Sequence, residues 1–166
     1  GIDAMNATTT GDNNIAIGAN AGDAITSAAG IVAIGTDALG ALTTGDYNLS
    51  IGYQAGDAIT TGAYNIAIGD SALGAETDTD ATIAIGYQAA LLQNSAGSAG
   101  DDTATTVVGH QAMRFNETGK HNTYIGYKSG YGASGQNNSY NTAVGYGSML
   151  AVTTGTYNTV VGLSAA

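Results

Sequence analysis

The side chains of this 166-residue chain that could contact a ligand concentrate in one stretch. All three basic residues fall within 15 positions, and both histidines and the single phenylalanine lie in that stretch or beside it. The favoured interpretation is a salt-bridge patch, or a slightly irregular rung with a longer exposed turn. The functional alternative is a contact for a ligand or receptor around Arg114, Phe115 and Lys120. The candidate contact patch consists of His110, Arg114, Phe115, Lys120, His121 and Lys128.

Paired carboxylates offer a weaker chemistry. Asp78 pairs with Asp80, and Asp101 with Asp102. Oxygen-rich turns of this kind can hold Ca²⁺, but the glycine-and-aspartate nonapeptide of calcium-binding β-rolls is absent, so solvated turns are the favoured interpretation. Paired acids could also hydrolyse glycosides, yet nothing in the sequence argues for an aromatic-lined cleft.

Catalytic and metal-binding motifs are not found. The two histidines stand 11 positions apart without a third ligand at metal spacing. A nucleophile elbow, a phosphate loop and a metalloprotease helix motif are all missing. We therefore expect no enzyme activity, no resident metal and no cofactor, with Ca²⁺ as the weak alternative.

Composition excludes several further classes. Three basic residues against 13 acidic ones give a net charge of −10, which disfavours nucleic acids and anionic membrane surfaces. No apolar run is long enough to span a bilayer, and the absence of cysteine excludes disulfides and thiol chemistry. Charged residues make up only 10%, and the apolar residues recur regularly, which indicates a repetitive architecture.

A glycine recurs every 17 residues and anchors a repeat, with longer steps of 23 and 19 where residues are inserted. The three residues before each internal anchor alternate in type. The first is mostly β-branched or threonine, the second mostly small, and the third always β-branched, which predicts a short strand. We expect the β-branched columns to be the buried ones. Following Gly1, the anchors are Gly18, Gly35, Gly52, Gly69, Gly86, Gly109, Gly126, Gly145 and Gly162.

A 17-residue unit is too short for two helices and fits one rung of a parallel β-solenoid of about nine rungs, each with two or three short strands and their turns. Regular rungs are expected over 1–92, an inserted surface loop over 93–102, and less regular rungs over 103–166. Because neither end carries a capping element, we expect a slice of a longer fibre.

Other columns of the repeat have their own chemistry. The third residue after each anchor is always Ala or Ser, which indicates close packing, and the next column tolerates size, so we place it at a roomier edge. Asn four before the anchor and the recurrent Thr-Thr-Gly strings predict corners. Tyrosines five before and one after the anchor predict stacked ladders that stabilise the coil and neighbouring chains. The alternative is that exposed tyrosines of these ladders bind sugars. Paired threonines raise an ice-binding alternative, in which only one threonine column could face ice.

Three phrases of the repeat carry a resemblance: Asn14 to Ala21, Asn65 to Ala72 and Asn141 to Ser148. They resemble the repeats of bacteriophage tail fibres and related virion fibres, and the head repeats of trimeric autotransporter adhesins. The resemblance covers essentially the whole chain. It implies a left-handed β-roll, three chains side by side, and a role in attachment.

The resulting hypothesis is a homotrimeric structural fibre on the virion surface, extracellular, that mediates host attachment or spaces a receptor-binding tip. Its partners would be its own copies, adjoining fibre or anchor segments, and a host glycan or protein. The alternative is the head of a bacterial surface adhesin that binds host matrix or glycans. A third class is a ligand-binding solenoid for ice or polysaccharide.

Overall fold

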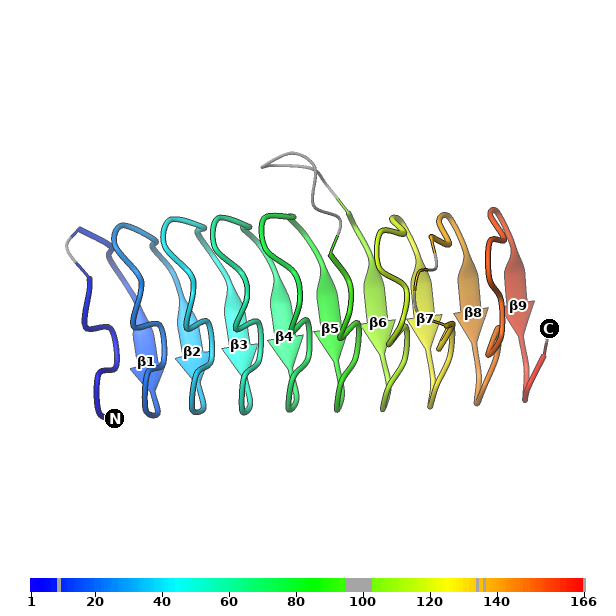
Figure 1. The fold of residues 1–166 in the computed structure, drawn as a ribbon, viewed down its shortest axis with the longest axis horizontal. Helices are drawn as coiled ribbons and strands as arrows, with labels where there is room; N and C mark the ends of the chain where they lie inside the picture. Colours follow the sequence, from blue (N-terminus) through cyan, green and yellow to red (C-terminus); the bar gives the residue numbers. More distant parts are fainter. Residues whose placement is uncertain (9, 95–102, 134, 136, 166) are drawn as a thin grey trace.

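The computed structural model describes residues 1–8, 10–94, 103–133, 135 and 137–165. The chain winds into a straight coil, and the strands form a nine-stranded parallel sheet in sequence order (Figure 1). Within the described residues each rung contributes one three-residue strand where two or three were expected, because left-handed residues interrupt the extended backbone on both sides of it. The strands are β1 (Ile15–Ile17), β2 (Val32–Ile34), β3 (Leu49–Ile51), β4 (Ile66–Ile68), β5 (Ile83–Ile85), β6 (Thr106–Val108), β7 (Thr123–Ile125), β8 (Thr142–Val144) and β9 (Thr159–Val161).

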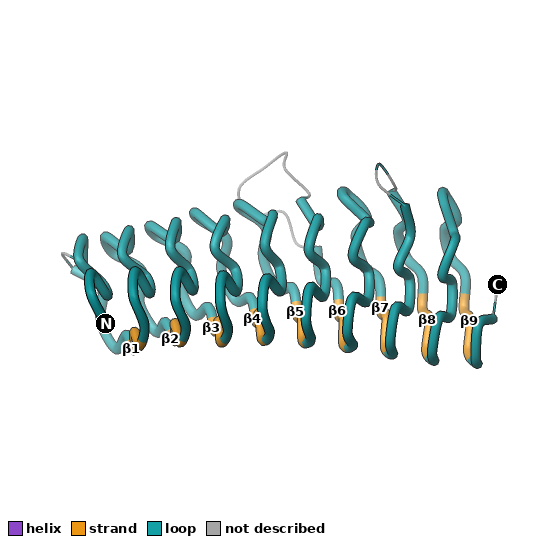
Figure 2. Tube along the Cα trace, turned by 60° about the horizontal axis from the view of Figure 1, so that its bottom comes forward, coloured by secondary structure: helices purple, strands orange, loops and turns teal. Residues whose placement is uncertain are grey.

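The strands pair in the register that the repeat predicts. Ile15 lies opposite Val32, 17 positions on, and Ile83 lies opposite Thr106 across the longer step. The sheet occupies one side of the coil, and turns and return segments form the rest (Figure 2). The predicted parallel β-solenoid is therefore confirmed. Residues 95–102, most of the expected inserted loop, lie outside the described residues.

The direction in which the strand side chains point is opposite to our expectation. Ala67, in the middle of β4, is fully buried, whereas Ile66 and Ile68 on either side of it remain partly exposed. Ile51 and Ile125 in the same column as Ile68 are 36% and 39% exposed. Because successive side chains alternate between the two faces of a strand, the β-branched columns line the outside of the coil and the small column lines the inside.

The interior of the coil is narrow. The middle residue of each strand, mostly a small one, faces the fourth residue after the anchor. A Cβ on Gly130 would lie 2.7 Å from the ring of Tyr124, and one on Gly56 would lie 2.8 Å from the Ser50 hydroxyl. In the rung of Ala67, the small alanine leaves room for Leu73 four positions after the anchor, and Leu73 is fully buried. The column that tolerates size therefore lies in the core, and our placement of it at an edge was wrong.

The rest of the core is formed by the Ala/Ser column and by the residues seven positions after the early anchors. The Ala/Ser column is buried throughout the inner rungs, as its restricted size predicted. Ile25, Leu42 and Ile59 fill the next layer and are replaced by Glu76 and Gln93 in the two rungs before the inserted loop. This one layer therefore becomes polar near the middle of the coil, while the other core columns stay largely apolar through Met113, Tyr124 and Met149.

The anchor glycines are corners, as predicted. Gly69 has φ of 130°, and a Cβ built on it would lie 2.5 Å from the carbonyl oxygen of Gly86 in the next rung. The second residue after each anchor also turns in the left-handed region, with Gln54, Gln88 and Lys128 all at φ of 51°. Glycine at the anchor is thus required both by backbone conformation and by the close approach of rungs.

The asparagine column supports the other corner from inside the coil. The buried Asn65 side chain accepts a hydrogen bond from the Thr82 N–H and donates one to the Thr79 carbonyl, both at 2.9 Å. The left-handed residue is the one before it, Tyr64, with φ of 61°. The asparagines therefore connect one rung to the next and leave the turn conformation to their neighbours.

Alkaline unfolding tests the core. Burial raises the pKa of Tyr124 to about 12, whereas an unfolded tyrosine titrates near 10. The neutral phenol is the form that the fold favours, so its contribution to stability is complete below pH 10 and is lost as the pH rises through 12. We expect the free energy of unfolding to fall by about 2 kcal/mol between pH 10 and 12 from this residue alone.

Urea denaturation at pH 9 and pH 11.5 measures this loss. Tyr124→Phe should show a smaller decrease between the two pH values than the wild type. Tyr157→Phe, at a side chain that is 76% exposed, provides the matched control and should decrease as the wild type does. Equal decreases in all three proteins would contradict the assignment.

Candidate functional site

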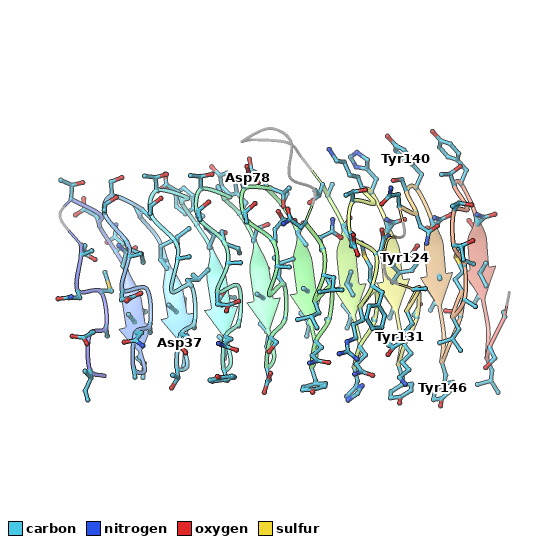
Figure 3. All side chains as sticks on the ribbon, viewed as in Figure 1. Asp37, Asp78, Tyr124, Tyr131, Tyr140 and Tyr146 are labelled. Carbon is cyan, nitrogen blue, oxygen red and sulfur yellow. The ribbon has the colours of Figure 1, made fainter. Side chains whose placement is uncertain are left out.

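The coil has two edges, and aromatic columns lie on both. The upstream edge carries the residues five positions before the anchors, and the downstream edge carries the residues just after them; Figure 3 shows Tyr140 on the first and Tyr146 on the opposite side. The aromatic members of the upstream edge are Tyr47, Tyr64, His121, Tyr140 and Tyr157. Those of the downstream edge are Tyr53, Tyr87, His110, Tyr127 and Tyr146.

Both edges contain the stacked ladders that the repeat predicts. On the upstream edge the Tyr140 ring lies 5.0 Å from His121 and 4.9 Å from Tyr157 between centroids. On the downstream edge His110 lies 5.2 Å from Tyr127, which lies 4.9 Å from Tyr146 at an interplanar angle of 13°. These contacts stabilise the stacking of rungs along each edge.

The structure divides the candidate contact patch between the two edges. His121 belongs to the upstream ladder, and the backbone N–H of its neighbour Lys120 donates to the Ser139 hydroxyl on the same edge. His110 and Lys128 lie on the downstream edge. The six residues therefore do not form one site.

Arg114 and Phe115 join the downstream group through Tyr131. The Phe115 ring meets Tyr131 edge to face at 5.0 Å, and the Arg114 guanidinium lies 4.9 Å from the centroid of Phe115. One terminal nitrogen of Arg114 donates to the Tyr131 hydroxyl at 3.4 Å. The guanidinium is therefore held against two rings.

Lys128 completes this group. Its ammonium lies 4.9 Å from the centroid of Tyr131 and 5.4 Å from that of Tyr127, distances at which a cation is attracted to a ring face. We call Arg114, Phe115, Tyr127, Lys128 and Tyr131 the cationic aromatic cluster. It combines two basic side chains with three rings on one edge of an otherwise acidic chain.

Neither cation of the cluster forms an ion pair with a carboxylate within the described part of the chain. The Nε atom of Arg114 is buried and has no hydrogen-bond partner there. Buried donors are ordinarily paired. No described carboxylate therefore neutralises the positive charge of the cluster, and the buried Arg114 Nε is left without a partner.

A pocket of about 290 Å³ opens beside the cluster, between the turns that follow β7 and β8. It adjoins exposed side chains, because Tyr127, Tyr146 and Leu150 are 38%, 56% and 41% exposed. Sequence reasoning missed the two wall residues Tyr131 and Leu150. The signal was available, since Tyr131 lies 17 positions after Arg114 in the same column. The pocket is lined by Tyr127, Lys128, Tyr131, Tyr146, Gly147 and Leu150.

Each paired carboxylate that the structure describes accepts a hydrogen bond from another residue of the chain. Asp78 accepts from the Thr77 hydroxyl at 2.7 Å, and Asp80 accepts from the Ala63 N–H at 2.7 Å. Asp101 and Asp102 lie outside the described residues. Within the described residues, no three His, Asp or Glu side chains come together as a metal site would require.

Two acidic residues of neighbouring early rungs, Asp37 and Asp57, interact with side chains and backbone groups around them. Burial, and more weakly the neighbouring Asp37 carboxylate, raise the pKa of Asp57, while backbone N–H groups oppose the shift. Asp37 itself accepts a hydrogen bond from the Asn20 side chain at 2.9 Å. These side chains are therefore part of the packing between rungs.

The threonine pairs present one outward column. The hydroxyl of Thr43 donates to the Thr60 carbonyl at 2.9 Å, and that of Thr60 donates to the Thr77 carbonyl at 3.0 Å, so this column holds rungs together. The exposed partner column contains Thr44 and Thr61 but continues to Asp78. A regular two-column threonine surface is thus not formed here.

Comparison with known proteins returns no match: no family model fits the chain, and no curated protein or solved structure is significantly similar to it. The described residues include no helix with the length and apolar character needed to cross a membrane.

Proposed function

We propose that this chain is a structural segment of a phage or virion fibre in which three copies pack side by side. The fibre would lie outside the cell, on the virion surface, and would attach to the host or hold a receptor-binding tip at a distance. The observation that carries the proposal is the exposed, largely apolar face of the sheet.

That face consists of the two outward columns of the strands. From β1 to β5 both columns are aliphatic, and from β6 to β9 threonine replaces the first of them. The columns run for about 38 Å at the usual spacing of parallel strands. These side chains are partly to largely exposed, and a continuous aliphatic column of this length is typical of a protein interface.

Another copy of the chain is the occupant that fits this face best. It offers an equally long, straight face with the same spacing between rungs, so contacts can repeat at every strand. The face carries no charged side chain in either outward column. Self-association would therefore cover aliphatic side chains without burying a charge.

The negative charge of the chain supports a rod that stays soluble and does not associate with other rods. With −10 on each copy, a three-chain rod would be strongly acidic, which keeps rods soluble and apart from one another. Both outward strand columns are free of charged side chains, so we expect association through that face.

The mass in solution tests the proposal. We expect light scattering to give three times the chain mass of 16.3 kDa, unchanged over a range of protein concentrations. A folded single chain at all concentrations would contradict the three-chain fibre.

A further inference from the structure

We propose that the pocket beside the cationic aromatic cluster binds an acidic sugar residue of a polysaccharide through the sugar's carboxylate. The inference gives the proposed attachment function a ligand class, and it rests on that function for its biological setting. The binding itself is a property of one edge of the coil, so it can be measured whatever the number of chains.

The pocket has the size and lining for a single ring-sized group. Its volume of about 290 Å³ is at the lower limit of small-molecule sites. Three tyrosine rings provide flat apolar surfaces and also hydroxyl groups that can exchange hydrogen bonds with sugar hydroxyls. Leu150 adds an aliphatic wall, and Gly147 also lines the pocket.

Unpaired positive charge points to an anionic group on that ring. Lys128 lines the pocket with its ammonium near the rings of Tyr127 and Tyr131, while Arg114 joins the same cluster through Tyr131. In a chain with 13 acidic side chains, neither cation has a carboxylate partner within the described residues. A carboxylate that enters the pocket would supply the missing counter-charge to Lys128.

The topology favours a sugar over an acidic peptide. Extended peptides commonly bind by adding a strand to a free sheet edge. The pocket lies beside the turns after β7 and β8, and both strands are already paired on each side. A sugar needs ring faces and point charges but no strand edge.

Oligogalacturonate provides a suitable probe because its methyl ester removes the charge and keeps the ring. We expect calorimetry to detect binding of trigalacturonate, with affinity at least about tenfold lower for the trimethyl ester. Binding should also weaken as salt is raised, since an exposed ion pair is screened.

Lys128→Gln is the decisive variant. Gln54, Gln88 and Gln111 occupy the same column at the same left-handed φ, so the substitution suits the turn. We expect it to lower the affinity for trigalacturonate at least about tenfold while the far-ultraviolet circular dichroism is unchanged. Lys120→Gln, on the upstream edge, removes the same charge and should bind as the wild type does.

Three outcomes would overturn the inference. One is undetectable binding of trigalacturonate by the folded wild type, and another is equal affinity in the wild type and Lys128→Gln. The third is a change of solution mass in Lys128→Gln, because the cluster would then be a contact between chains. If the wild-type mass is that of one chain but trigalacturonate binding depends on Lys128, the sugar site stands and the fibre proposal fails.

Discussion

Gly69→Ala is expected to destabilise the coil by about 3–5 kcal/mol, because one methyl group would strain the backbone and also collide with the next rung. Gly69 has φ of 130°, a conformation that side chains avoid, and the new Cβ would lie 2.5 Å from the Gly86 oxygen. The rung cannot move away, since the Gly69 N–H donates to Ile51 and the Gly86 N–H to Ile68 at 2.8 and 2.7 Å. Thermal and urea unfolding measure the loss.

Gly40→Ala is the matched control for this prediction. Gly40 does not turn in the left-handed region, and a Cβ there would meet its nearest neighbour, the Asp37 carbonyl oxygen, at an ordinary 3.4 Å. We expect a change within about 0.5 kcal/mol. Similar losses for Gly69→Ala and Gly40→Ala would show that rung spacing does not depend on the anchor glycines.

The repeat was sufficient to predict the rungs and the position of the strand before each anchor, but not that each described rung would contain only this one strand. Every β-branched residue before an anchor glycine, such as Ile68, is at the end of a strand that pairs with its equivalent in the next rung. The 17-residue period determines this pairing because neighbouring rungs can form a ladder only when equivalent residues meet. The inserted residues shift the period at two steps without breaking the ladder.

The same pattern could not determine which strand face is inside. Alternation defines two faces, and the usual preference of large aliphatic residues for the core selected the wrong one. The deciding factor is the width of the coil, which depends on the facing residue four positions after the anchor. Tyr124 fits inside because Gly130 faces it, a pairing that becomes evident only when the two columns are read together.

The candidate site was also predicted only in part, because residues close along the chain need not be close in this fold. Closeness along the chain placed Lys120 and His121 with Arg114, although residues six or seven positions apart lie on different edges of a 17-residue turn. Tyr131 was overlooked because it is 17 positions from Arg114, yet that spacing makes it the neighbour. Distances in this fold follow the period of the rung, which composition alone does not reveal.

The outward strand face provides the prediction with the largest effect on assembly. In the double variant Ile51→Asp and Ile68→Asp, two carboxylates are added to adjacent rungs of one outward column. Since both side chains point away from the core, the coil should remain folded, with unchanged circular dichroism. If three copies pack through this face, burying unpaired carboxylates would cost several kcal/mol and reduce the light-scattering mass to that of one chain.

A second double variant, Thr44→Asp and Thr61→Asp, tests whether added charge alone, away from the outward strand face, changes the solution mass. It adds the same two charges to an exposed column in which the third rung already carries Asp78. The mass of this control should equal that of the wild type. Loss of β-structure in the isoleucine variant would mean that its column is buried within one coil. A wild-type mass with intact structure would remove this face as the interface, because two unpaired carboxylates could not remain buried there without a large loss of affinity.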